Sequence, residues 1–215
     1  MPPAPISAPR VVLGIAGGSG SGKSWLAKAV AERFAGRSTV VCHDWYYRNH
    51  GGIHDEAERV KLNFDHPDSL ETTLMRRQLD ALIAGETIEA PIYEYASHSR
   101  KKETRRVEPR ELLIIDGILI LHEKELRDRM NVSVFIDAPD DVRLMRRVRR
   151  DCTERRIDLE ETLRLYEDYV RPMHHRYVVP SSHHATWIWS QLEDKKFPEL
   201  LIKDLERRLD GKIAA

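Results

Sequence analysis

The stretch VVLGIAGGSGSGKS at positions 11–24 decides the fold of this 215-residue chain. Val11 to Ala16 form a short apolar run rich in β-branched residues, which predicts a buried strand. Gly17 to Ser24 follow at once and match the pattern G-x-x-x-x-G-K-[ST]. Trp25 to Phe34 then carry helical periodicity. Strand, glycine-rich loop and helix in this order predict the first half of a βαβ unit with a phosphate-binding loop.

The composition of this loop explains why it can bind the phosphates of a nucleotide. Glycines let several backbone N–H groups face one anion, and the N-terminus of the following helix adds a positive dipole. The lysine reaches the terminal phosphates, and the hydroxyl after it can bind Mg²⁺. The alternative is a glycine-rich turn that binds nothing, and the flanking strand and helix argue against it. The predicted nucleotide-binding residues are Gly17, Gly18, Ser19, Gly20, Ser21, Gly22, Lys23 and Ser24.

Further apolar runs extend the fold outward from this unit. Residues 39–42, 112–115 and 132–136 are continuous rather than alternating, which predicts a parallel sheet covered by helices on both faces. Helices are predicted at 69–84, with Ser69 as N-cap, and at 140–152 and 159–170. The pattern at about 89–107 indicates a β-hairpin inserted at the rim of the sheet. We expect one α/β domain over residues 11–215, of the P-loop NTPase or kinase type, after a disordered tail at 1–10.

The composition excludes several classes of protein. Lys plus Arg and Asp plus Glu number 35 each, so no net charge draws the chain to nucleic acid or to an anionic membrane. No apolar run is long enough to span a bilayer, and the first ten residues lack the pattern of a signal peptide. Cys42 and Cys152 are far apart and have no metal-binding spacing, which is typical of a reducing compartment. We therefore expect a cytoplasmic protein with neither a nucleic-acid nor a membrane partner.

Two of the predicted strands end in a carboxylate, Asp44 and Asp116. In an open parallel sheet the carboxyl ends of the strands line the ligand crevice, so both side chains should face the terminal phosphate of the nucleotide. Asp44 is predicted to take the proton of an attacking hydroxyl group and to help place Mg²⁺. Asp116 has the position of a Walker B carboxylate and is predicted to bind Mg²⁺ together with Ser24. A turn or helix cap is the alternative role for each aspartate.

Arginines are concentrated in one predicted helix and just after it, where residues 146–150 read RRVRR. Arg147 and Arg150 are three residues apart and therefore share one helix face. We predict that they neutralise charge on the transferring phosphoryl group, that Arg155 binds the nucleotide, and that a lid at about 147–165 excludes water. A solvated face that pairs with neighbouring acids is the alternative.

Two predicted loops combine aromatic, acidic and histidine side chains. They read NFDHPD at 63–68 and YEYASHSR at 93–100. An acid can hold vicinal hydroxyls, and aromatic faces can enclose a flat ring. Such residues are often plain surface when they occur alone. Beside a phosphate loop they predict a pocket for a sugar and a base.

Together these motifs resemble the uridine–cytidine kinase family over roughly residues 11–180. The resemblance implies a P-loop kinase sheet with a β-hairpin over the acceptor, a mobile lid, and assembly into tetramers or dimers. It implies that Asp44 is the base and that Asp65, assisted by Arg147, holds the ribose hydroxyls. The residues implied to surround the nucleobase are Tyr47, Phe64, Tyr93 and His98.

Three positions depart from the family pattern. Asp116 stands where the family usually has the longer glutamate, and Ile157 and Leu165 replace polar residues expected near the nucleobase. The segment ATWIWS at 185–190 also differs from the usual one. The shorter side chain of Asp116 predicts a metal contact through water. The loss of two polar contacts at Ile157 and Leu165 concerns the choice of base rather than phosphoryl transfer.

The sequence therefore predicts an enzyme that phosphorylates uridine or cytidine to its 5′-monophosphate, with ATP or GTP as donor and Mg²⁺ as cofactor. A kinase of another hydroxyl compound is the first alternative. A pentose phosphate would need an extra anion site, which the basic residues at 100–106 can supply. A regulatory protein that uses the phosphate loop as a switch is the second alternative, and the carboxylate at Asp44 argues against it.

Overall fold

The computed structural model describes residues 8–52 and 61–212, and its centre is a parallel five-stranded sheet. The strands lie in the order β2-β5-β1-β6-β7, and each neighbouring pair is parallel. Their bounds are β1 (Val11–Gly17), β2 (Ser38–Cys42), β5 (Leu112–Asp116), β6 (Val132–Asp137) and β7 (Trp187–Ser190). The four predicted strands are confirmed, and β7 is a fifth strand that was not predicted.

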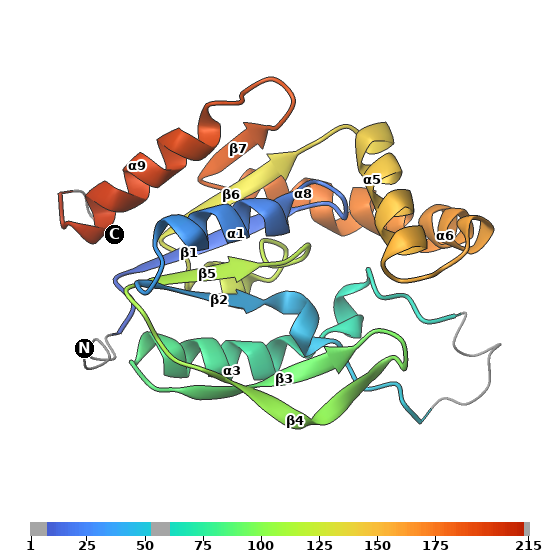
Figure 1. Ribbon diagram of the computed structural model, residues 1–215, viewed down its shortest axis with the longest axis horizontal. Helices are drawn as coiled ribbons and strands as arrows, with labels where there is room; N and C mark the ends of the chain where they lie inside the picture. The colour runs from blue at the N-terminus through green and yellow to red at the C-terminus, as the bar shows by residue number, and fades with distance from the viewer. Residues whose placement is uncertain (1–7, 53–60, 213–215) are drawn as a thin grey trace.

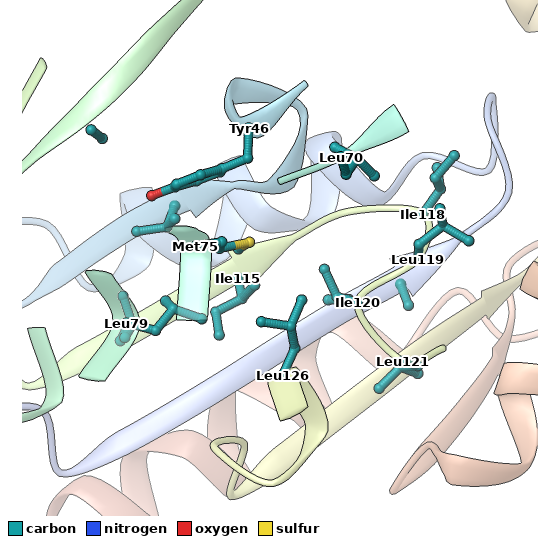
Figure 2. Close-up of a cluster of buried hydrophobic side chains, with 14 of the residues drawn as sticks. Tyr46, Leu70, Met75, Leu79, Ile115, Ile118, Leu119, Ile120, Leu121 and Leu126 are labelled. Carbon is teal, nitrogen blue, oxygen red and sulfur yellow. The ribbon is translucent and has the colours of Figure 1, made fainter. Parts of the chain in front are cut away.

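Both faces of the sheet are buried, which explains the continuous apolar strands. In β1, Leu13 and Ile15 pack with one core, while Val12 and Ala16 belong to the core on the opposite face. Helices α1 (Lys23–Arg33) and α9 (Phe197–Leu209) cover the first face, and α3 (Thr72–Ile83) with the short α4 (Lys124–Arg127) covers the other (Figure 1). Figure 2 shows the second core, where the side chains of α3 and α4 meet those of β5 and of residues 118–121.

The predicted hairpin is present, and Arg100 connects it to the segments that follow β2 and precede α3. Strands β3 (Ile88–Glu94) and β4 (Ser99–Val107) pair antiparallel below α3 in Figure 1. The Arg100 guanidinium donates hydrogen bonds to the carbonyl oxygens of Tyr47 and Tyr46, each at 2.8 Å, and to Glu71 Oε2 at 2.6 Å. The basic residues of the hairpin lie in β4.

The predicted lid consists of helices beyond the carboxyl ends of the strands. Helix α5 (Asp140–Thr153) is followed by α6 (Leu159–Leu165), and both lie at the right of Figure 1. The chain then returns to the sheet through short helical segments that are partly π-helical: η3 (Tyr166–Val170), α7 (Arg171–Met173), η4 (His174–Val178), α8 (Val179–Ser181) and η5 (Ser182–His184). The helix predicted at 159–170 therefore changes character at Tyr166.

The N-cap predicted at Ser69 is wrong. Ser69 ends a 3-10 turn, η2 (Pro67–Ser69), and its hydroxyl donates to the carbonyl oxygens of Phe64 at 3.0 Å and His66 at 2.6 Å. A hydroxyl used inside its own turn cannot cap a helix, and α3 begins only at Thr72. Residues 1–7 of the predicted tail lie outside the described residues. No described helix combines the length and the apolar character needed to cross a membrane.

Candidate active site

The phosphate loop leaves β1 and ends at the first turn of α1, as predicted. Gly20 and Gly22 have positive φ angles of 81° and 93°, which side-chain-bearing residues rarely adopt. Gly22 is the N-cap of α1, and the Ser21 N–H donates to the Gly18 carbonyl oxygen at 3.0 Å. The loop thus directs its backbone and the start of α1 to one point, where a polyphosphate fits.

Three arginines of α5 donate hydrogen bonds to this loop from the lid side. Arg143, only 1% exposed, donates to the Ser19 carbonyl oxygen at 3.4 Å and pairs with Asp140 at 2.6 Å. Arg146 donates to the Gly20 carbonyl oxygen at 3.2 Å, and Arg147 donates to Ser19 Oγ at 3.2 Å. Arg143 and Arg146 were not predicted as site residues. Arg143 precedes Arg146 by three residues and Arg147 by four, so helical spacing alone places it beside both, a signal that the sequence contained.

A serine and a carboxylate meet beside the loop at the predicted metal position. Ser24 Oγ donates to Asp116 Oδ2 at 2.7 Å. Burial raises the pKa of Asp116, and the charge of Lys23 and the Ser24 hydrogen bond oppose that shift. Asp116 Oδ1 is buried and accepts no hydrogen bond among the described residues. A hydroxyl, a carboxylate and a free buried oxygen fit Mg²⁺, which keeps several waters and uses few protein ligands.

Asp44 lies at the end of β2, as predicted, in the first turn of η1 (His43–Tyr46). Cys42 pairs with Asp116 in register, so the two carboxylates emerge from neighbouring strand ends. The negative charge of Asp44 helps to raise the pKa of both Asp116 and Asp65. The hydroxyl of Tyr95 donates to Asp44 Oδ2 at 3.3 Å. Asp44 therefore stands between the metal position and the hairpin.

The predicted base-binding residues come together under the hairpin. The ring of Tyr47 lies 5.5 Å from that of Phe64 and 5.3 Å from that of Tyr93, measured between centroids. Phe64 and His98 stack at 4.9 Å with an interplanar angle of 26°. Tyr95, which was not predicted as a site residue, completes the group at 5.4 Å from Tyr93. Residues from the end of η1, the segment before α3 and the hairpin thus form one aromatic cluster.

Asp65 connects this cluster to the lid. Burial raises its pKa, and the positive charge of Arg147 is the strongest opposing influence, followed by that of Lys23. A carboxylate with an arginine close by can accept hydrogen bonds from vicinal hydroxyls and keep its charge. The resemblance implied that Arg147 assists Asp65; in the structure the charge of Arg147 acts on Asp65, while the ion pair of Arg147 is with Asp151 at 3.2 Å.

The other lid arginines converge on a single buried acid, Asp151, whose side chain is 1% exposed. Arg147 lies 3.2 Å from its carboxylate, Arg150 2.8 Å and Arg155 3.5 Å. The guanidinium carbon of Arg155 also lies 4.6 Å from the ring centroid of Tyr95. The structure therefore places Arg155, predicted as a nucleotide ligand, against the hairpin.

A cavity of about 570 Å³ adjoins the phosphate loop at Gly22. Trp25, Trp189 and Gln191 line it, with Arg146 on the lid side. Arg146 donates to Gln191 Oε1 at 2.6 Å. Trp189 and Gln191 were missed because they belong to β7 and the turn after it, a segment that the sequence marked only as a departure from the family pattern.

Comparison with known proteins agrees with this arrangement. The model of the Phosphoribulokinase / Uridine kinase family matches residues 12–198. A uridine kinase from Ligilactobacillus salivarius (strain UCC118) is 40% identical over 175 residues, which cover 81% of this chain and 82% of that protein. A uridine kinase from Streptococcus agalactiae serotype V is 39% identical over 176 residues, 81% of this chain and 84% of that protein.

This chain belongs to the phosphoribulokinase / uridine kinase family. The resemblance drawn from the motifs is confirmed, and with it the P-loop kinase fold. Phosphoribulokinase from Rhodobacter spheroides shares the fold at a TM-score of 0.58 and 10% identity, over 81% of this chain and 67% of that one. Membership in this kinase family also makes a nucleotide the phosphate donor, in agreement with the phosphate loop.

The family match extends through the lid and through β7 to residue 198. It therefore includes the cavity beside Gly22 and the segment at 185–190 that departs from the usual pattern. In this family member Trp189 of that segment is buried, and its indole N–H donates to the Asp194 carbonyl oxygen at 2.6 Å. The departure at 185–190 thus builds the edge of the sheet and one wall of the cavity.

Proposed function

We propose that this kinase transfers the terminal phosphoryl group of ATP to the 5′-hydroxyl of uridine or cytidine. The observation that carries the proposal is the position of Asp44, between the phosphate loop with its Ser24–Asp116 pair and the aromatic cluster. A proton acceptor in that position suits an acceptor substrate whose hydroxyl reaches Asp44 while its flat ring lies in the aromatic cluster. The relatives at about 40% identity are uridine kinases, which agrees with such an acceptor.

The proposed mechanism assigns one task to each group of side chains. The aromatic cluster of Tyr47, Phe64, Tyr93 and His98 surrounds the pyrimidine, and Asp65 with Arg147 holds the ribose hydroxyls. Asp44 accepts the proton of the 5′-hydroxyl as its oxygen attacks the terminal phosphorus and the bond to ADP breaks. The products are ADP and the nucleoside monophosphate.

Positive charge on both sides of the phosphates supports this transfer. Lys23 and the phosphate loop lie on one side, and Arg147 and Arg150 approach from the lid. Ser24, Asp116 and, beside them, Asp44 would hold Mg²⁺. When bound, this ion screens the charge of the phosphates and fixes their orientation.

The cavity beside Gly22 is the proposed position of the base of the donor. It adjoins the end of the phosphate loop, and its volume of about 570 Å³ lies within the range of small-molecule sites. Trp25 offers an exposed aromatic face, and Gln191 offers an amide. The same cavity would accept the base of GTP. ATP as the donor, rather than GTP, is therefore part of the proposal.

The alternative acceptor, a pentose phosphate, finds less support. Four of the five basic residues of the hairpin that would bind its phosphate are engaged elsewhere: Arg100 pairs with Glu71, Lys101 with Glu94 at 3.3 Å, and Arg106 with Glu108. Arg105 stacks on Trp45 at 4.2 Å. These contacts make the hairpin arginines structural and leave the aromatic cluster as the specific feature of the acceptor side.

Two further parts of the proposal concern the setting of the enzyme. Both cysteines are free thiols, which suits the cytoplasm. The family resemblance suggests a homo-oligomer, a tetramer or a dimer. Light scattering coupled to size-exclusion chromatography tests this assembly, and a mass of one chain of 25.0 kDa would contradict it.

An acceptor panel tests the proposed reaction. Formation of ADP is measured with ATP and Mg²⁺ in the presence of uridine, cytidine, a purine nucleoside or ribulose 5-phosphate. We expect turnover with the two pyrimidine nucleosides and the matching monophosphate by chromatography. Turnover with the sugar phosphate alone would establish the first alternative, and turnover that no acceptor changes would establish the regulatory one.

A further inference from the structure

The proposed base, Asp44, is partly exposed, and on the hairpin side its carboxylate contacts the side chain of Tyr95. Tyr95 follows β3, and its hydroxyl donates to Asp44 Oδ2 at 3.3 Å. This hydroxyl is thus placed on the carboxylate that the proposed mechanism assigns to the hydroxyl of the acceptor. A phenol keeps its proton at neutral pH, so the Tyr95 hydroxyl remains a hydrogen-bond donor to this carboxylate.

The ring of Tyr95 is fixed by neighbours on both sides of the cleft. Tyr93 and Tyr47 pack against it with ring centroids 5.4 Å and 6.5 Å away. From the lid, the guanidinium carbon of Arg155 lies 4.6 Å from its centroid, and Arg155 is in turn 3.5 Å from Asp151. One side chain therefore links the lid, the hairpin and Asp44.

This link bears on a problem that every kinase of a small hydroxyl compound has. Water is also a hydroxyl nucleophile, and a base beside a bound nucleotide can accept its proton. Oxygen of water would then attack the terminal phosphorus, the bond to ADP would break, and phosphate would be released. Exclusion of water before the acceptor arrives prevents this loss of ATP.

We propose that the hydroxyl of Tyr95 occupies Asp44 until the nucleoside displaces it, and so keeps water away from the base. This inference rests on the proposed role of Asp44. When the acceptor binds, its 5′-hydroxyl replaces the Tyr95 hydroxyl as the donor to the Asp44 carboxylate. Until then, Arg155 holds the ring of Tyr95 in place. Tyr95 is therefore a positioning residue whose effect is seen when the acceptor is absent.

Hydrolysis of ATP without acceptor is the decisive measurement, and Tyr95→Phe is the decisive variant because it removes only the hydroxyl. We expect phosphate release without acceptor to rise at least about fivefold, the scale of one lost hydrogen bond. Phosphorylation of uridine should persist, with an equal or lower KM for uridine. Tyr46→Phe is the matched control, because its hydroxyl donates to Gln78 Oε1 at 2.7 Å and not to Asp44. Its hydrolysis should stay at the wild-type level.

The double variant Tyr95→Phe with Asp44→Asn separates this inference from the proposed function. If Asp44 activates the water, the added hydrolysis disappears in the double variant. Unchanged hydrolysis in Tyr95→Phe, with uridine still phosphorylated, would overturn the role of Tyr95 and leave the proposed function intact. Added hydrolysis that survives in the double variant would also overturn it. A wild-type enzyme that ignores uridine would refute the proposed function instead.

Discussion

Asp44 and Asp116 leave neighbouring strands, yet their surroundings give them different chemistry. Asp116 is 4% exposed and accepts the Ser24 hydroxyl, which suits a fixed ligand of a cation. Asp44 is partly exposed and contacts a phenol from the opposite wall, which suits a group that exchanges its partner during turnover. The different burial of two identical side chains thus suits Asp116 to a fixed metal contact, while the more exposed Asp44 can combine a contact with the metal and the proposed role of the base.

Asp44→Asn tests that division at a single residue. Asparagine keeps the size of the side chain but cannot take a proton from the 5′-hydroxyl. We expect kcat for uridine to fall by roughly 10²-fold or more, with ATP binding and the melting temperature largely retained. Single-turnover phosphorylation and thermal melting measure the two effects. A lower melting temperature with intact chemistry would make Asp44 a structural cap.

His43, the residue before Asp44, gives a pH-dependent prediction. Burial lowers its pKa from 6.5 to about 4, and neither ring nitrogen has a hydrogen-bond partner among the described residues. Below pH 6.5 this histidine therefore binds a proton in the unfolded chain but stays neutral in the folded chain. The free energy of unfolding therefore decreases as the pH is lowered from 6.5 toward 4. We expect a loss of about 2 kcal/mol in unfolding free energy between pH 7.5 and 5 from this residue.

The variant His43→Gln removes this titration and should flatten the pH dependence of unfolding by urea over that range. His183→Gln is the control, because His183 is exposed. The same slope in the wild type and in His43→Gln would contradict the assignment.

At the scale of elements, helix α5 carries both the arginines that contact the phosphate loop and those proposed to face the phosphoryl group. The sequence predicted that Arg147 and Arg150 share a face, because helical spacing alone decides this. It did not predict that Asp151 would be the buried partner of three arginines. A carboxylate that is close to several arginines in the sequence is equally consistent with an ion pair exposed to solvent. Three guanidiniums near one point repel each other, and the single buried carboxylate offsets that repulsion while leaving excess positive charge.

Asp151→Asn removes this counter-charge without changing the shape of the side chain. We expect the arginines to move apart, kcat to fall by about tenfold or more, and the effect on KM for uridine to be smaller. The matched control is Asp141→Asn, an exposed residue in the first turn of the same helix. Steady-state kinetics of both variants, with melting curves, measure the outcome. Equal kinetics in both variants would show that Asp151 does not position the lid.

The elements themselves were predictable to different degrees. Continuous apolar runs marked four strands because strands buried on both faces cannot alternate. β7 escaped notice because it is an edge strand of four residues whose Trp187 and Ile188 are exposed. The cap at Ser69 was wrongly predicted because hydroxyls compete for carbonyl oxygens in turns, a choice that depends on the neighbouring fold.

At the scale of the whole molecule, the site combines segments that are far apart in the sequence. The types of residue in each segment indicated a phosphate loop, a base and an aromatic pocket before any geometry was known. The contacts between segments, such as Tyr95 with Asp44 and Arg155 with Tyr95, are 51 and 60 residues apart in the chain and depend on how hairpin and lid meet. No local sequence pattern predicts contacts between segments so far apart in the chain. The cavity between Gly22 and Gln191 was missed for the same reason.

Because lid and hairpin touch through Arg155 and Tyr95, the two substrate sites should be energetically coupled. A donor bound under the lid arginines fixes the lid, and the fixed lid positions the hairpin side of the acceptor pocket. We expect uridine to bind at least about fivefold more tightly when a non-hydrolysable ATP analogue and Mg²⁺ are present. Calorimetric titration of uridine with and without the analogue measures this ratio, and the reverse titration must give the same factor.

In Arg155→Gln the factor should fall toward one, because the contact with Tyr95 is lost while the aromatic cluster remains. Equal affinity for uridine with and without the analogue in the wild type would mean that the contact between lid and hairpin transmits nothing, and that the two substrates bind independently.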